Sequence, residues 1–252
     1  MQNYLIFNTI TSLVKKNQFL PVDSNVGPNF SGTDTKELFE KNLKTLPLDW
    51  EYRNKIIKYT LNSNGYRTKE FKKIDWANSI VVFGCSNVFG VGLDDEDTIC
   101  SQLEKITGIP VINMGIGGSS ITYSLHNSII LKDGYPTPRA VVHLWTDYNR
   151  TVYYRRNHVQ SYGSWNLEKN NYMDVWSSSK HHGATHALMA SITSKHLWNN
   201  TSYYEASFWD ENSKLLNCDY LKMEDCARDL LHPGIKTARG IASKINDNLK
   251  CK

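Results

Sequence analysis

The 252-residue chain has no apolar run of membrane-spanning length and no sustained stripe of Lys or Arg. The first absence excludes a bilayer-spanning helix. The second, with a net charge of only +4, gives no indication of a nucleic-acid partner. Lys15 and Lys16 follow the apolar N-terminal stretch, whereas in a signal peptide the charges come first. We therefore expect a cytoplasmic protein with no membrane span.

Cysteine is scarce and its spacing is irregular. The five cysteines, an odd number, include no CxxC pair. This excludes the common spacings of zinc and redox sites and favours free thiols in a reducing compartment. The alternative is one disulfide between Cys218 and Cys226. The sequence also lacks internal repeats and low-complexity tracts, and its 40% hydrophobic and 21% charged residues are ordinary for a globular protein.

The middle of the chain alternates between strand and helix patterns. Continuous apolar runs predict buried strands, and the segments between them predict helices. The expected strands are 79–83, 110–113 and 140–145, and the expected helices are 95–106 and a segment to about 131 capped by Ser119 or Ser120. This order is typical of an α/β fold with a parallel sheet. Ser86, Gly118 and Asp147 each follow a strand, so we expect all three at the carboxyl edge.

The flanking regions fit this pattern less well. Residues 1–75 are predicted to be an N-terminal extension packed on the main domain of residues 76–252. In the extension we expect a helix at 35–46, capped by Thr33 or Asp34, and a strand at 59–67 ending in an Asn-Gly turn. Residues 150–217 are rich in aromatics and predict a lid or insertion with a helix at 184–198. A last helix is expected at 235–249.

Two short segments carry the chemistry. Ser86 follows a strand that breaks at Gly84, and Asp229 lies three residues before His232. A serine hydroxyl needs a base to take its proton and a third group to orient that base. These segments supply the three residue types of a serine hydrolase, provided that the fold brings positions 86 and 232 together.

In order and spacing, these residues resemble the SGNH (GDSL-type) hydrolases. Gly84-Cys85-Ser86 is similar to the family's nucleophile segment, Asn113 to Ser119 to its second segment, and Asp229-Leu230-Leu231-His232-Pro233-Gly234 to its last. The resemblance implies a three-layer α/β/α sandwich with a parallel sheet of the flavodoxin-like kind. It also implies Ser86, Asp229 and His232 as the catalytic triad, and backbone N–H groups of Ser86 and Gly118 in the oxyanion hole.

The chain departs from the family pattern at two positions. Cys85 replaces the aspartate beside the nucleophile, and Cys85 as nucleophile is the disfavoured alternative because it leaves the turn in another direction. In the third segment, an ungapped match puts Asp147 where the family has asparagine. A carboxylate cannot donate to an oxyanion. We therefore expect Asn149 to complete the oxyanion hole, with Asp147 as the ungapped alternative.

The functional expectation is an ester hydrolase acting through an acyl-enzyme, without metal or organic cofactor. The expected partner is a small-molecule or glycan ester with a small acyl group such as acetyl. One alternative is an inactive SGNH-like module with a binding or structural role, for instance in a viral particle. Another is acyl transfer by the same triad. His181, His182 and His186 suggest a zinc site only weakly, because acidic or cysteine partners at ligand spacing are missing. Arg155 and Arg156 are interpreted as a solvated pair.

Overall fold

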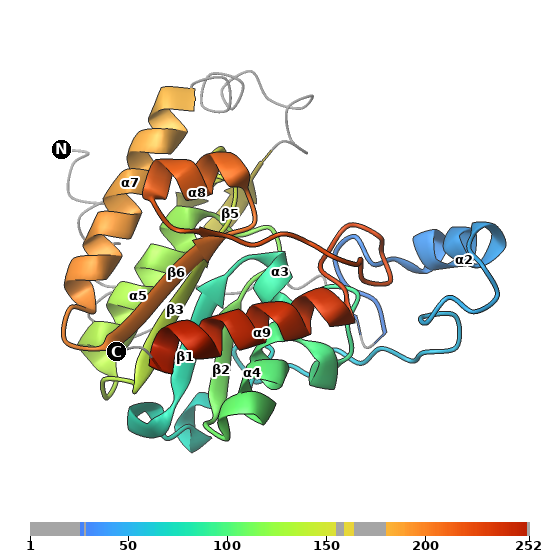
Figure 1. Cartoon of the computed structure of the whole chain (residues 1–252), viewed down its shortest axis with the longest axis horizontal. Coiled ribbons are helices and arrows are strands. Elements are labelled where there is room, and N and C mark those ends of the chain that lie inside the picture. The colour runs from blue at the N-terminus through green and yellow to red at the C-terminus, as the bar shows by residue number, and fades with distance from the viewer. Residues whose placement is uncertain (1–25, 28, 155–158, 164–179, 251–252) are drawn as a thin grey trace.

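A parallel five-stranded sheet forms the centre of the computed structural model, which describes residues 26–27, 29–154, 159–163 and 180–250. The strand order is β2-β1-β3-β6-β7. On one face, α4 (Ile99–Thr107) packs with α9 (Ile235–Lys250), and on the other α5 (Ile121–Gly134) packs with α7 (Lys180–Leu197) (Figure 1). The predicted three-layer α/β/α architecture is confirmed.

The central strands are apolar on both faces because helices cover both. Val82 belongs to the core under α4 and α9, whereas Val81 and Phe83 belong to the core under α5. This explains the unbroken apolar runs, which are typical of parallel strands. The strands are β1 (Ile80–Gly84), β2 (Val111–Gly115), β3 (Ala140–Trp145), β6 (Ser202–Ser207) and β7 (Asp219–Tyr220).

The strand register brings three loops to one edge. Gly84 at the end of β1 pairs with Gly115 of β2 and with Leu144 of β3. All pairings in this five-stranded sheet are parallel, so the segments that follow these residues leave the sheet together. Ser86, Gly118 and Asp147 belong to these segments, as predicted.

The fourth strand, β6, lies inside the range predicted as a lid or insertion. It pairs with β3 in the main sheet and is flanked in sequence by α7 and α8 (Asp210–Leu216). Glu205 is buried, but as a charged residue it interrupts the apolar pattern from which β6 could have been predicted. Its carboxylate accepts hydrogen bonds from Trp145 Nε1 (3.1 Å) and Tyr203 OH (3.0 Å) and pairs with Lys195 Nζ (2.7 Å). A buried charge with this many donors is tolerated in a core strand.

An antiparallel hairpin precedes α7. It consists of β4 (Thr151–Tyr154) and β5 (Val159–Tyr162), with Thr151 paired to Tyr162. The aromatic residues expected to line a lid include Trp165, Tyr172 and Trp176, which lie outside the described residues, as do Arg155 and Arg156.

In the described part of the N-terminal segment, residues 26–27 and 29–75, the side chains of Tyr52, Ile57 and Tyr59 belong to the main core. Two features predicted for this segment are wrong. The helix is α2 (Lys36–Thr45), and Thr35 caps it, since Thr35 Oγ1 accepts from the Leu38 N–H at 3.1 Å. Thr33 and Asp34, the predicted caps, have other partners. Residues 59–67 form no strand, because the Asn62 side chain accepts from the Tyr66 N–H and holds the chain in a turn.

Other boundaries shift by a few residues. Asp95–Asp97 is a separate 3₁₀ turn, and α4 begins after it because Thr98 caps the helix. Ser120, one of the two predicted caps, accepts from the Tyr123 N–H at the start of α5. Of the helices in the described part of the chain, none has the length and apolarity needed to cross a membrane. The described cysteines are free thiols, so Cys218 and Cys226 form no disulfide.

Candidate active site

Ser86 is held in a tight turn from β1 into the short helix α3 (Ser86–Phe89). The turn lies so close to neighbouring backbone atoms that two of its contact positions have room only for glycine. A Cβ on Gly84 would come within 2.9 Å of the Leu144 carbonyl, and a Cβ on Gly115 within 2.4 Å of the Phe89 nitrogen. The turn thus packs on the ends of β2 and β3, and only 8% of Ser86 remains exposed.

The loop before α9 carries Asp229 and His232. Two backbone hydrogen bonds close it, from the Ala227 N–H to the His232 carbonyl (2.8 Å) and from the Leu230 N–H to the Ala227 carbonyl (2.9 Å). Asp229 Oδ1 accepts from the N–H groups of Leu231 and His232, both at 3.1 Å. These bonds fix the carboxylate relative to the imidazole of the same loop.

A hydrogen-bonded chain joins the two segments. His232 Nδ1 lies 2.6 Å from Asp229 Oδ2, and His232 Nε2 lies 2.8 Å from Ser86 Oγ. Because an ionised carboxylate only accepts, Nδ1 carries a proton, and in the neutral ring Nε2 then faces the serine with its lone pair. The structure therefore brings together the three residues that the sequence singled out, 146 positions apart in the case of Ser86 and His232.

Asp229 is buried, yet its carboxyl remains acidic. Burial alone would raise its pKa, but the hydrogen bond and charge of His232, the Thr33 hydroxyl and the Leu231 N–H together outweigh burial. The net result is an Asp229 pKa below its ordinary value. The carboxylate is thus charged at neutral pH and able to orient the imidazole and stabilise its protonated form.

The loop after β2 is anchored beside Ser86. The Gly84 carbonyl accepts from the Ile116 N–H (3.1 Å) and from Ser119 Oγ (3.1 Å). Gly118 lies between these anchors with φ +69°, a conformation that favours glycine. The hydrogen bonds of the described residues assign no acceptor to the Gly118 N–H. This N–H and that of Ser86, the first residue of α3, are available to an oxyanion.

The third segment differs from the first two. Asp147 Oδ1 accepts from the Asn149 N–H at 2.9 Å, which bends the chain directly after β3. Asn149 Oδ1 is buried without a hydrogen-bond partner among the described residues. No hydrogen bond in this part of the structure joins Ser86 to either side chain. Which of Asp147 and Asn149 faces a bound substrate stays a prediction.

Sequence reasoning missed two residues near the site. Thr33 Oγ1 donates to Asp229 Oδ2 at 2.6 Å, from 196 positions away in the chain. Asp225 caps α9, because its carboxylate accepts from the N–H groups of Lys236 and Thr237. Asp225 lies well before Ile235, the first residue of α9, so no N-cap pattern indicated the second of these. Nothing in the sequence indicated the first.

Metal ligands do not gather in the described residues, where no group of three His, Cys, Asp or Glu side chains could hold an ion. The rings of His182 and His186 lie 4.5 Å apart on α7. Burial, followed by the neighbouring His182, lowers the pKa of His186.

Comparison with known proteins gives matches among solved structures, while no protein-family model and no curated protein sequence matches the chain. A GDSL-like lipase from Bacteroides uniformis has 11% identity and a TM-score of 0.45, covering 70% of this chain and 97% of its own. The acetyl xylan esterase Est2A from Butyrivibrio proteoclasticus has 10% identity and a TM-score of 0.43, covering 71% and 65%. A member of the lipolytic G-D-S-L family from Veillonella parvula has 11% identity and a TM-score of 0.41, covering 67% and 96%. The chain is thus similar to GDSL-like lipases and to SGNH-hydrolase esterases, at low sequence identity.

Proposed function

We propose that the protein is a serine ester hydrolase, with Ser86, His232 and Asp229 as its catalytic triad. The observation that carries the proposal is the hydrogen-bonded chain from Asp229 Oδ2 through both ring nitrogens of His232 to Ser86 Oγ, at 2.6 and 2.8 Å. A serine held this way has a base at its proton and an orienting group on the far side of that base.

The reaction follows from this geometry. Ser86 Oγ attacks the ester carbonyl carbon while His232 Nε2 takes the hydroxyl proton. The tetrahedral intermediate collapses, the bond to the leaving alkoxide breaks, and His232 returns the proton to that oxygen. Water then attacks the acyl-enzyme, giving its proton to His232, and Ser86 is released with its proton restored. Asp229 stabilises the imidazolium in each half of the cycle.

The oxyanion that forms in each half needs hydrogen-bond donors. The N–H groups of Ser86 and Gly118 serve this role in the proposal, together with the side chain of Asn149. We expect Asn149→Ala to lower kcat about 100-fold, which is typical of losing one oxyanion donor. If Asp147 faces the oxyanion instead, Asp147→Asn raises kcat, because an amide donor replaces a repelling carboxylate. Steady-state kinetics of both variants distinguishes the two assignments.

Small acyl groups, with acetyl on a glycan as the leading example, are the proposed substrates. The near-complete burial of Ser86, at 8% exposed, favours a short acyl chain at the nucleophile. The test compares p-nitrophenyl acetate with p-nitrophenyl butyrate as substrates. We expect a higher kcat/KM for acetate, and equal values for the two esters would contradict the small-acyl assignment.

The test of the triad uses the same acetate ester. Ser86→Ala and His232→Ala are each expected to lower kcat by at least about a thousandfold. His196→Ala, which removes an exposed histidine at the end of α7, is the matched control and should keep wild-type turnover. Wild-type turnover equal to that of Ser86→Ala, with acetylated sugars also offered, would contradict the proposal.

A second candidate is an inactive module of the same fold that binds a glycan or serves a structural role. The observation that favours it is Asp147, a carboxylate at the position where the SGNH pattern has a donor. It predicts acetyl-glycan binding that survives Ser86→Ala and is not accompanied by ester cleavage. Calorimetric titration of Ser86→Ala with an acetylated sugar, beside product analysis with the wild type, separates the two functions.

A further inference from the structure

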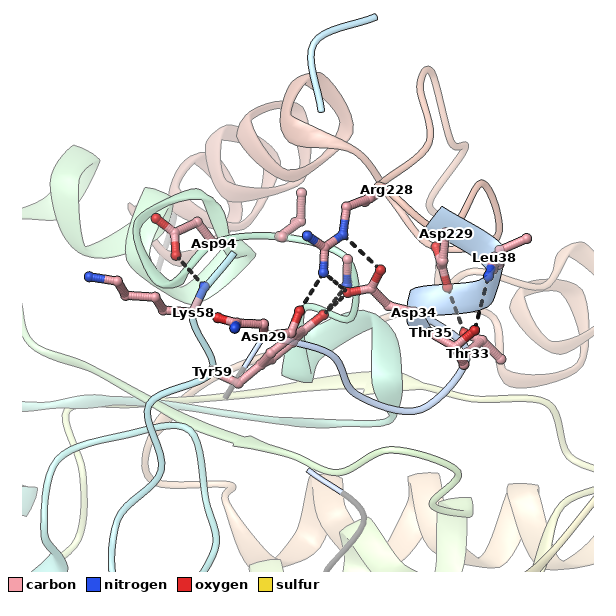
Figure 2. Close-up of polar contacts among 12 residues, drawn as sticks. Asn29, Thr33, Asp34, Thr35, Leu38, Lys58, Tyr59, Asp94, Arg228 and Asp229 are labelled. Carbon is pink, nitrogen blue, oxygen red and sulfur yellow. Dashed lines mark hydrogen bonds and ion pairs between the residues drawn. The ribbon is translucent and has the colours of Figure 1, made fainter. Parts of the chain in front are cut away.

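The N-terminal segment reaches into the acid–base pair. Thr33 Oγ1 lies 2.6 Å from Asp229 Oδ2 and 3.5 Å from His232 Nδ1. Figure 2 shows Thr33 turned toward Asp229 from the segment that leads into α2. Asp229 Oδ2 therefore has two donors, the imidazole and this hydroxyl, while Oδ1 has the two backbone N–H groups of its own loop. Thr33 is the one of these four donors that comes from outside the loop.

A buried ion pair lies directly beside this contact and fixes the two chain segments relative to each other. Asp34 follows Thr33, Arg228 precedes Asp229, and these two neighbours bind each other. Arg228 Nε lies 2.9 Å from Asp34 Oδ1 and Arg228 Nη2 lies 2.8 Å from Asp34 Oδ2 (Figure 2). Both side chains are at most 3% exposed. Two parallel hydrogen bonds fix distance and orientation together, so the pair sets the separation of Thr33 and Asp229.

The same ion pair connects to the loop that follows Ser86. Tyr59 OH donates to Asp34 Oδ2 at 2.6 Å and accepts from the Gly92 N–H at 2.8 Å. The Gly92 carbonyl in turn accepts from the Arg228 N–H at 3.2 Å. One network thus joins three parts of the chain: the loop that follows Ser86, the loop that carries Asp229 and His232, and the N-terminal segment. We call the second of these the acid–base loop. We call residues 33–34, 59, 92 and 228–229 the clamp.

We propose that Thr33 is a positioning residue that orients the Asp229 carboxylate toward His232, and that the clamp makes the N-terminal segment part of the active site. The inference rests on the proposed function. Without the Thr33 hydroxyl, the carboxylate keeps its charge but loses the donor that fixes Oδ2. Proton transfer between Ser86 and His232 then starts from a less favourable geometry, whereas substrate contacts are unchanged.

The test removes only the hydroxyl. Thr33→Val keeps the branched shape, and we expect kcat for p-nitrophenyl acetate to fall about tenfold with KM within about twofold of wild type. Thr33→Ser keeps the donor and should restore most of kcat. Thr35→Val is the matched control, because it removes a hydroxyl two residues away that caps α2 and that forms no hydrogen bond to Asp229 among the described residues. It should leave both constants near wild type.

The pH dependence of kcat/KM is a second measurement, and we expect it to be unchanged if the substitution only loosens the N-terminal segment. The Thr33 hydroxyl is one of the groups that lower the pKa of Asp229. Removing it leaves the Asp229 carboxylate with one donor fewer, so the carboxylate stabilises the imidazolium of His232 more strongly and the acidic limb of kcat/KM moves to higher pH in Thr33→Val. Thr33→Ser and Thr35→Val should keep the wild-type limb. Equal kcat and equal pH profiles for Thr33→Val and Thr35→Val would overturn the inference.

A measurement without substrate separates this inference from the proposed function. The His232 Nδ1 proton, hydrogen-bonded to Asp229, is observable at low field by proton NMR. We expect its resonance to shift or broaden in Thr33→Val and to stay in place in Thr35→Val. Wild-type protein without Ser86-dependent turnover would remove the proposed function, and the resonance would still test Thr33. An unchanged resonance in Thr33→Val would overturn the inference even in an active enzyme.

Discussion

At the scale of single residues, the acid–base loop adopts a conformation that its sequence does not favour. Leu230, between Asp229 and Leu231, has φ +61°, where a side chain costs about 1–2 kcal/mol. The loop's own hydrogen bonds offset this cost, including the Leu230 N–H to the Ala227 carbonyl at 2.9 Å. The conformation brings the N–H groups of residues 231 and 232 onto the Asp229 carboxylate.

At Gly92 the chain has no room for a side chain beside the acid–base loop. Its φ is +76°, and an added Cβ would lie 2.8 Å from Ala227 Cβ and 3.0 Å from the Arg228 nitrogen. We expect Gly92→Ala to lower the free energy of unfolding by about 2 kcal/mol or more and to lower kcat, because it displaces the acid–base loop. Urea denaturation and ester turnover measure the two effects.

Gly108 is the matched control for this prediction. It has φ +66°, but nothing lies within 4 Å of an added Cβ. Gly108→Ala should therefore lose only the conformational term, about 1 kcal/mol, and keep wild-type kcat. Equal stability losses and equal kcat in the two variants would contradict the role assigned to the contact between Gly92 and the acid–base loop.

Asp229 offers a test of tautomer control. Asp229→Asn keeps the size of the side chain but can present an amide N–H to His232 Nδ1, which favours the tautomer with its proton on Nε2. That proton then faces Ser86 and the base is lost. We expect kcat near pH 7 to fall by about a thousandfold or more, with little change in KM. A loss of less than tenfold would contradict the assigned role.

The sequence predicted those site residues whose chemistry is visible locally. Ser86 follows a strand and a glycine, and the Asp229–His232 spacing is short enough for one loop to form the pair. Thr33 has no such local signal, because its role depends on a contact across 196 positions. Thr33 was instead predicted to cap a helix, a role that Thr35 fills.

At the scale of elements, the clamp joins the N-terminal segment to two loops of the sheet. The guanidinium of Arg228 also lies over the rings of Phe30 and Phe39, 4.6 and 5.0 Å from their centroids. Two aromatic faces and one bidentate carboxylate thus surround a single buried charge. The N-terminal segment is therefore expected to unfold together with the main domain.

Breaking the buried pair tests this coupling. Asp34→Asn leaves the Arg228 charge buried without a full counter-charge, so we expect a loss of about 3–5 kcal/mol in the free energy of unfolding. The matched control is Asp210→Asn, which removes the exposed i,i+4 partner of Lys214 and should cost at most about 0.5 kcal/mol. Chemical denaturation of both variants checks the difference. Similar losses would contradict a structural role for the clamp.

Elements were predictable where a single pattern dominates. Apolar runs indicated β1 and β3, which have no competing local signal. β6 was missed because Glu205 looks polar in sequence, while its partners Trp145, Ser191 and Lys195 come from other elements. The false strand at 59–67 has the opposite cause. Its aromatic residues favour a strand, but the Asn62 side chain imposes a turn.

At the scale of the whole molecule, buried histidines make stability depend on pH. His143 is fully buried in β3, and burial lowers its pKa to about 3. Burial also lowers the pKa of His126 to about 4. Below about pH 6.5 the unfolded chain takes up these protons and the folded chain does not. The stability that depends on these two rings staying neutral is therefore fully present above about pH 6.5 and is lost as the pH decreases toward the folded pKa values.

We expect the protonation of His143 in the unfolded chain to lower the free energy of unfolding by about 1.4 kcal/mol for each unit that the pH decreases between about pH 6 and 4. His143→Gln removes the titrating ring, so the slope of unfolding free energy against pH should decrease by that amount. His196→Gln, at an exposed position, is the control and should keep the wild-type slope. Urea denaturation at several pH values measures the slopes. An unchanged slope in His143→Gln would contradict the account.

The central claim is that Ser86 forms a covalent acyl-enzyme with His232 as its base. The most direct measurement is mass spectrometry of protein quenched during turnover of p-nitrophenyl acetate, followed by peptide mapping. The account predicts one acetyl group, on the peptide that contains Ser86, and its absence in Ser86→Ala and His232→Ala. Acetylation that is missing in the wild type, or that persists unchanged in His232→Ala, would contradict the claim.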